Sequence, residues 1–339
     1  MNKLFVRKKK KQPEKPERVT EDSIEEHREK VLSKGRKFKY PIQYARYKLV
    51  INTVLVGVVA VLLLGVFGWL QLYQFQSTGD LAYRVVKILP LPVAEVDGRA
   101  VRYSDYLMIF RSSLAAVERQ QGKLEDTEDD KVLREHFKRV ALDDAEVYTY
   151  AMKLAEELGI EVTQEQIDQT SYAHRMVDGV EKSEENFVKI LEENFGLSKS
   201  EYERLVKMSL IKMEVSLRID EEAKKLADEI EMELASEDIN TIAEKYVGKV
   251  SYEDTGGLVD NMNLDGGRAE VAAELEVGQV SGRLVSKNGD GYYFVKLIAK
   301  EDDQVRYVSI LISFTELDNR MAALRENGGI KEHIRLNRE

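Results

Sequence analysis

The sequence is poor in the residues on which most catalytic and metal sites depend. Its 339 residues include no cysteine and only four histidines, His27, His136, His174 and His333. Without cysteine, disulfide bonds, thiolate nucleophiles and cysteine-ligated zinc sites are excluded. None of the histidines has a partner at metal-ligand spacing, and neither a glycine-rich phosphate loop nor a Gly-x-Ser-x-Gly motif occurs. We therefore expect no metal and no cofactor.

Charge is distributed unevenly along the chain. Residues 1–48 contain 16 Lys and Arg against 7 Asp and Glu, whereas the remainder contains 35 against 54. The first part thus has a net charge of +9 and the rest a net charge of −19. A strongly acidic body repels the phosphate backbone, so no nucleic-acid partner is expected for it.

A long apolar run separates the basic and acidic parts. From Leu49 to Leu70 the chain has 22 residues without a charge, and Trp69 and Tyr73 stand at its far end. A helix of this length spans about 33 Å, enough for a hydrocarbon core of about 30 Å. The alternatives are a buried core helix, which rarely lacks a polar face over such a length, and a cleaved signal peptide, which has a shorter run and a small-residue cleavage site. We predict a retained single-pass membrane helix.

Basic residues predict the orientation of this helix. The cluster Arg7–Lys11 and six further cations between Lys34 and Lys48 precede the run, but only Arg84 and Lys87 follow it closely. The positive-inside rule then predicts a cytoplasmic N-terminus and an extracytoplasmic body at the plasma membrane. The basic cluster is equally consistent with a topology signal alone and with binding of anionic lipid.

Pattern and composition divide the chain into five parts. Apolar positions spaced three or four apart and two capping-box motifs predict helices from residue 90, among them a long helix from Ser198 to about Leu234. Glycine becomes frequent after Gly248, and two β-rich runs, 292–299 and 305–312, predict an antiparallel hairpin. The fold class is therefore α+β. The expected parts are a basic, largely disordered head with a short helix around 21–32 (1–48), the membrane helix (49–70), a linker (71–89), a helical domain (90–235) and an α+β domain (236–339).

Three stretches of the helical part carry a family resemblance. They read VAEVDGRAVRYSDY, ALDDAEVYTYAMKLAEELGIEVTQEQID and FVKILEENFGLSKSEYERLVKMSLIKMEV, beginning at Val93, Ala141 and Phe187. In this order and spacing they resemble the N-terminal chaperone region of the SurA/PrsA family of extracytoplasmic folding factors. The resemblance covers roughly 130 residues and implies a protein that binds unfolded exported polypeptides.

The last part resembles a parvulin-type peptidyl-prolyl isomerase domain. SEDINTIAEKY, DTGGLVD and LEVGQVSGRLVSKNGDGYYFVKL follow that family's order of a helix, a Gly-Gly turn, a second turn and a closing strand. The family's first strand is not recognisable before its first helix, but a similar run, VRYVSILIS, follows the closing strand. This order implies a circularly permuted domain, with 330–336 as a last edge strand.

The resemblance assigns three candidate catalytic positions, and two of them depart from the family. Ser309 and Tyr293 stand where parvulins have histidines, and only Asp254 retains an acidic residue. Pocket aromatics of the family correspond to Arg268 and Ala273. Serine and tyrosine form hydrogen bonds but do not titrate near neutral pH. The alternative interpretation is that Asp254 is a turn residue without a catalytic role. Strong isomerase activity is not expected.

Three functions remain open from the sequence. The first is a membrane-anchored chaperone that binds unfolded or proline-containing exported polypeptides between its two domains, where Met208, Met213 and Met262 offer adaptable apolar contacts. Taken singly, each of these methionines fits a core position better than a client contact. The alternatives are an active peptidyl-prolyl cis-trans isomerase with a rewired polar site and an envelope scaffold that binds a single partner.

Overall fold

The computed structural model describes residues 20–39, 41–125, 127–177 and 180–336. The chain forms two compact units, Met1–Trp69 and Leu70–Glu339, and each is described by itself. In the first unit, α1 (Glu21–Lys39) and α2 (Pro41–Trp69) are helical. The helix predicted around 21–32 is present in α1, whereas the disorder predicted for residues 1–19 lies outside the described residues.

The apolar run forms one helix that is long enough to cross a membrane. The candidate span extends over Tyr47–Gln74, which is 28 residues long and strongly apolar. Over residues 49–67 its side chains are exposed to the surroundings rather than packed on protein, as Leu55 and Leu63 illustrate. An exposed run of this kind is stable in lipid and not in water, which is compatible with a single-pass anchor.

The first part of the second unit is built from helices and a small sheet. Strands β1 and β2 form a hairpin, and the helices around it bury a continuous apolar core. Thr163 and Gln166 form the predicted capping box of α6, and Ser198 and Glu201 form that of α8. The elements are α3 (Asp80–Ile88), β1 (Pro92–Val96), β2 (Arg99–Arg102), α4 (Tyr103–Gln121), α5 (Glu128–Leu158), α6 (Gln164–Arg175), β3 (Met176–Val177), β4 (Val180–Glu181), α7 (Glu184–Phe195) and α8 (Lys199–Ile219).

The predicted linker 71–89 is largely structured. The π-helical turn η1 (Leu70–Gln74) places Leu72 in the core of the second unit, where it is 3% exposed. The hydroxyl of Tyr103 donates to the carbonyl of Leu72 at 2.7 Å, and the hydroxyl of Tyr73 donates to that of Pro92 at 2.7 Å. The end of the apolar span is therefore joined to the body through packed residues.

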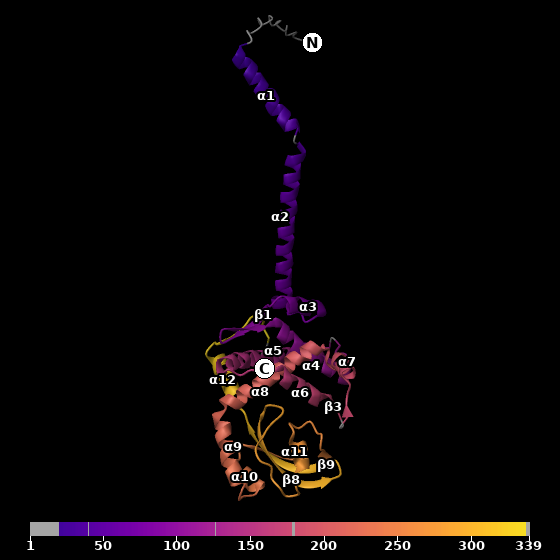
Figure 1. Ribbon diagram of the computed structural model, residues 1–339, viewed down its shortest axis with the longest axis vertical. Coiled ribbons are helices and arrows are strands. Elements are labelled where there is room, and N and C mark those ends of the chain that lie inside the picture. The colour runs from indigo at the N-terminus through magenta and orange to yellow at the C-terminus, as the bar shows by residue number, and fades with distance from the viewer. Residues whose placement is uncertain (1–19, 40, 126, 178–179, 337–339) are drawn as a thin grey trace, which may run out of the picture. The chain divides into compact units, whose positions relative to one another are not determined.

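The second part is a twisted antiparallel sheet with helices on both faces (Figure 1). The predicted hairpin is present: Tyr292 to Glu301 pair with Ile312 to Gln304 in continuous register, apart from one bulge. The strand order is β5-β9-β8-β7, and β6 also pairs with β9. The elements are α9 (Glu221–Glu233), α10 (Ile239–Lys245), β5 (Ser251–Asp254), β6 (Val259–Asp260), α11 (Arg268–Glu274), β7 (Leu284–Val285), β8 (Gly291–Glu301) and β9 (Gln304–Ser313).

Residues of the hairpin alternate between two separate cores. Phe294 and Ile310 face α9 and α10, whereas Val295 and Tyr307 face α11. This alternation follows from the period of two in a strand. The fold class is α+β, as predicted.

Three details of the predicted division are corrected. The long helix from Ser198 ends at Ile219, where Asp220 interrupts it and begins α9. Helix α9 packs on the sheet rather than on the helical core. The segment 330–336, expected as an edge strand of this sheet, instead contributes β10 (Ile330–Glu332), which pairs with β1.

The chain thus returns to the helical part after the sheet. Helix α12 (Glu316–Glu326) buries Leu317 and Met321 in the helical core. At the crossing, the carboxylate of Asp220 accepts hydrogen bonds from the backbone N–H groups of Thr315 and Glu316 at 2.6 and 3.0 Å. The buried side chain of Asp220 therefore joins the end of α8 to the beginning of α12.

Candidate functional site

The sheet face covered by α11 holds two of the three predicted site residues. Tyr293 lies opposite Leu311, and Ser309 lies opposite Val295, so the side chains of Tyr293 and Ser309 point to the same face. Both are buried, at 4% and 1% exposure. The structure therefore brings these two positions together.

Asp254 lies on the other face of the sheet. It pairs in register with Val308, whose side chain belongs to the core beneath α9 and α10. Its carboxylate accepts a hydrogen bond from the backbone N–H of Gly256 at 2.8 Å and forms an ion pair with Arg306 at 3.2 Å. These two contacts, in that order, lower the pKa of Asp254. Asp254 is thus separated from Tyr293 and Ser309 by the thickness of the sheet and has the contacts of a turn residue.

The guanidinium of Arg268 occupies the space beside Tyr293 and Ser309. It extends from the first turn of α11 and lies 4.7 Å from the ring centroid of Tyr293 and 5.9 Å from that of Tyr307. Its Nη1 donates to Ser309 Oγ at 3.2 Å and forms an ion pair with Glu253. A cation held against aromatic faces is favourable when it is desolvated, and this side chain is only 11% exposed. Arg268 therefore fills the position where the family resemblance implies an open apolar pocket.

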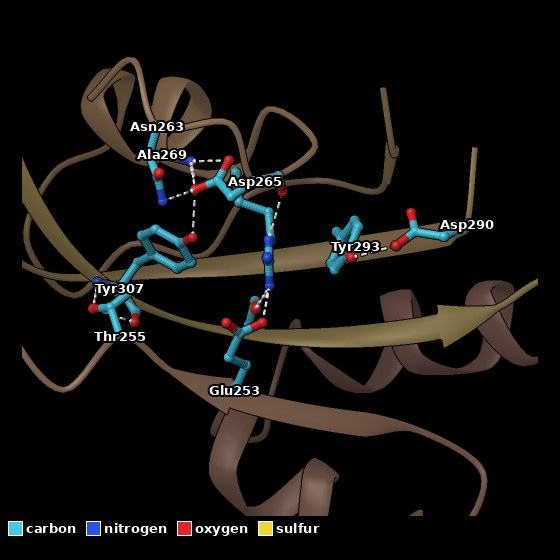
Figure 2. A network of polar contacts seen from close by, with 10 residues as sticks. Glu253, Thr255, Asn263, Asp265, Ala269, Asp290, Tyr293 and Tyr307 are labelled. Carbon is cyan, nitrogen blue, oxygen red and sulfur yellow. Dashed lines mark hydrogen bonds and ion pairs between the residues drawn. The ribbon is translucent and has the colours of Figure 1, made fainter. Parts of the chain in front are cut away.

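Asp265 organises the other side of this cluster (Figure 2). Its carboxylate accepts a hydrogen bond from the hydroxyl of Tyr307 at 2.5 Å and two from the backbone N–H of Ala269 at 3.1 and 3.2 Å. Gly266, with φ of +80°, leads the chain from Asp265 into α11; a Cβ there would lie 2.7 Å from Ser286 Oγ. Local backbone geometry therefore holds Asp265 beneath the helix start, where an acidic group is stabilised by the free N–H groups.

The two tyrosines and the arginine of the cluster keep their protons at neutral pH. Burial, followed by the hydrogen bond to Asp290, raises the pKa of Tyr293 to about 12. Burial and the hydrogen bond to Asp265 also raise the pKa of Tyr307. Burial opposes the charge of Arg268, but its hydrogen bond with Glu253 and the electrostatic effects of Tyr307, Tyr293 and Glu253 together outweigh burial, so the pKa of Arg268 is raised. Tyr293, Tyr307 and Arg268 thus offer a fixed cation and hydrogen bonds, and none of these three groups exchanges a proton near pH 7.

A second candidate site is a cleft in the helical part. It encloses about 270 Å³ between α6, α7 and the beginning of α8. Aromatic side chains lie beside charges of both signs, and Arg175 lies 5.6 Å from the ring centroid of Tyr172. Such mixed surfaces accommodate peptide segments of varied sequence. The lining residues are Asp168, Ser171, Tyr172, Arg175, Glu184, Phe187, Val188, Lys199, Tyr202 and Glu203.

The three methionines proposed for client binding have different environments. Met208 is 2% exposed and belongs to the helical core. Met213 is half-buried and lies against the loop containing Gly289, where an added Cβ would lie 3.0 Å from Met213 Cβ. Met262 is 44% exposed on the loop before α11. Of the three, Met208 is unavailable to a client without opening the core.

Comparison with known families agrees with the helical core and its capped helices. The family described as SurA-like N-terminal domain matches residues 42–215. This match covers half of the chain, which therefore belongs to the SurA/PrsA-like family. No curated protein matches the sequence.

Sequence reasoning missed most of the polar cluster. Glu253, Asp265 and Tyr307 carried no assigned role, and Arg268 was noted only as a replaced pocket position. The motif Asp265-Gly266-Gly267 directly before a helix was the available signal, since an acidic residue at this place commonly caps a helix. The contact of Tyr307 with Asp265 joins residues 42 positions apart, and no local pattern reports it.

Proposed function

We propose that this protein is a membrane-anchored extracytoplasmic chaperone that binds unfolded exported polypeptides. The observation that carries the proposal is the SurA-like N-terminal domain over residues 42–215, which suggests a chaperone-type function. The cleft lined by Tyr172 and Arg175 supplies a place for a client segment. Apolar and charged groups side by side there suit clients of varied sequence.

The anchor in this proposal is the helix Tyr47–Gln74. Its exposed apolar surface and its length support a single membrane crossing. The +9 charge of residues 1–48 supports a cytoplasmic N-terminus and an extracytoplasmic body. Because the chain lacks cysteine, single cysteines at Ser33 and Met262 provide a direct test. In intact cells, a membrane-impermeant maleimide should label the second and not the first; the opposite pattern would reverse the orientation.

The sheet domain is proposed to be a permuted parvulin-like domain. The run VRYVSILIS forms β9 between β5 and β8, which is the neighbourhood that the permutation requires. Helix α11 covers the face that holds Tyr293 and Ser309. With Arg268 in the pocket position and no histidine in the cluster, this domain is proposed to bind or position clients with little isomerase activity.

An aggregation assay on the full chain in detergent micelles tests the proposal. The wild-type protein should suppress aggregation of a chemically unfolded client diluted from denaturant, and Tyr172→Ser should weaken this suppression. The matched control is Tyr252→Ser, since Tyr252 is similarly exposed (44% against 48%) but lies on the sheet domain. Absence of suppression by the wild type, or equal effects of both variants, would refute a chaperone working through this cleft.

An active isomerase is the second candidate, favoured by the meeting of Tyr293 and Ser309 on one face. A proline-peptide assay separates the two functions. We expect cis-trans conversion at the uncatalysed rate, with a time constant of about tens to hundreds of seconds. Catalysis by the wild type that is lost in Tyr293→Phe and kept in Tyr252→Phe would instead establish the enzyme.

A further inference from the structure

Helix α3 carries a second apolar face that no part of its own unit covers. Ala82 and Val86 point inward and are buried in the helical core. Leu81 and Ile88 point outward and are 77% and 81% exposed. These two residues are seven positions apart, two helical turns, and thus share one face. Large apolar side chains at this exposure are costly in water, so the outer face of α3 is expected to meet a non-aqueous partner.

The neighbouring segments also carry exposed apolar residues. Phe75, directly after the apolar span, is 67% exposed, and Leu89, directly after α3, is 50% exposed. Together with Leu81 and Ile88 they form what we call the α3 patch. All four residues lie within 15 positions of the end of the span at Gln74.

Among the charged residues of α3, a cation lacks an ion-pair partner in the described part of the chain. Arg84 lies between Leu81 and Ile88 on the exposed face and forms no ion pair within the part of the chain that the structure describes. Asp80 is the sole acidic residue of α3, and its charge is compensated by an ion pair with Arg111 at 2.5 Å. The patch therefore presents apolar side chains around a free cation, which is complementary to anionic headgroups above a hydrocarbon layer.

The connection to the span restricts where the α3 patch can lie. The core position of Leu72 and the hydrogen bonds of Tyr73 and Tyr103 fix the turn that ends the span to the body. From Gln74 only five residues lead to α3. A chain of that length keeps α3 close to the membrane surface from which the span emerges.

We propose that the α3 patch rests on the anionic phospholipid headgroups of the extracytoplasmic leaflet, with Leu81 and Ile88 in the apolar boundary and Arg84 at the phosphates. This contact holds the body against the bilayer instead of leaving it free on a tether. The inference relies on the membrane anchoring proposed above. It does not depend on the nature of the client.

Single cysteines in the otherwise cysteine-free full chain test this proposal. Leu81→Cys and Ile88→Cys are labelled with a nitroxide after reconstitution into nanodiscs of phosphatidylcholine and phosphatidylglycerol. Collisions with molecular oxygen, which concentrates in lipid, and with a water-soluble nickel complex then report the surroundings of each label. The matched control is Leu264→Cys, because Leu264 is an equally apolar and 95% exposed residue of the sheet domain. Val59→Cys, within the span, reports anchoring.

We expect the ratio of oxygen to nickel collisions to be several-fold higher at positions 81 and 88 than at 264. The Arg84→Glu substitution should lower the ratio at position 81 and leave that at 59 unchanged. Equal ratios at 81, 88 and 264, with a lipid-like ratio at 59, would overturn the α3 contact while leaving the anchor intact. A water-like ratio at 59 would overturn the anchor itself. Shielding of 81 and 88 from both reagents would indicate a protein surface there and would also contradict the proposal.

Discussion

Glu146 provides the sharpest test of how the helical part is held together. It lies within α5 with no solvent exposure, and its Oε2 is 3.3 Å from Nη2 of Arg325 on α12. Its other oxygen has no hydrogen-bond partner among the described residues. Arg325 also pairs with Asp143 at 2.6 Å, and Arg139 joins Asp143 to Glu332 on β10. This buried network connects the returning C-terminal segment to α5.

The environment of Glu146 makes its ionised form costly. Burial, and then the negative charge of Glu332, raise the pKa of Glu146 from 4.5 to about 7, against the opposing effect of Arg139 and Arg325. Between these two pH values the unfolded chain has released the proton while the folded chain retains it. Folding is therefore favoured at low pH by this group, and that contribution is lost as the pH rises to 7.

The magnitude follows from the size of the shift. Each pKa unit corresponds to about 1.4 kcal/mol, so a shift from 4.5 to about 7 amounts to about 3 kcal/mol of unfolding free energy. The Glu146→Gln substitution keeps the shape of the protonated side chain and removes its titration. The stability of this variant relative to wild type should rise by about 3 kcal/mol from pH 4 to pH 8.

Urea unfolding of the compact unit Leu70–Glu339, followed by circular dichroism at both pH values, measures this difference. Taking variant minus wild type cancels the titration of the other carboxylates. The control is Glu161→Gln, since Glu161 is exposed and lies outside this network. A pH-independent difference for Glu146→Gln, or greater relative stability at pH 4, would refute the reasoning.

Three further substitutions are predicted to lower the unfolding free energy of the same fragment. Asp220→Ala removes the acceptor of three backbone N–H groups at the crossing and should cost about 3 kcal/mol, measured by urea unfolding. Gly291→Ala should cost about 2 kcal/mol or more by the same assay, because its Cβ would lie 2.2 Å from the carbonyl oxygen of Ile312. Tyr307→Phe leaves the buried carboxylate of Asp265 without its hydroxyl donor and should lower thermal stability by about 1–2 kcal/mol without changing the far-ultraviolet spectrum. An unchanged midpoint in any of these experiments would contradict the corresponding contact.

Local patterns predicted the features that depend on neighbouring residues. The apolar run from Leu49 to Leu70 lies within the observed candidate span. The capping boxes at Thr163 and Ser198 begin α6 and α8, because their hydrogen bonds involve only residues three positions apart. The short polar turn at Glu301–Gln304 joins two β-rich runs that could pair only as a hairpin.

Contacts between distant residues account for what the sequence did not reveal. Strand β10 pairs with β1, although more than 200 residues separate them in the sequence. The ion pair of Arg139 with Glu332 joins residues 193 positions apart. The break at Asp220 combines a local N-cap hydrogen bond from Ala223 with distant hydrogen bonds from Thr315 and Glu316, and the sequence there contains neither Gly nor Pro. Likewise, Asp254 occupies the acidic position of the parvulin-like motif, but its side chain lies on the face of the sheet opposite Tyr293 and Ser309. Strand register determines this face, and the motif does not reveal it.

The segment that returns to the helical part shows that the folded helical domain includes residues beyond the end of the family match. The matched domain ends at residue 215, yet the core that α4 and α5 build also contains Leu317, Met321 and Ile334. The sheet domain is therefore an insertion into the helical domain. It leaves at Asp220 and returns at Thr315, and the carboxylate of Asp220 holds both ends. Because β1 is the central strand between β2 and β10, the helical core is incomplete until residues 330–334 have been synthesised. The inserted sheet domain must consequently be made before the helical domain can close, so its own folding precedes or accompanies completion of the proposed client-binding domain.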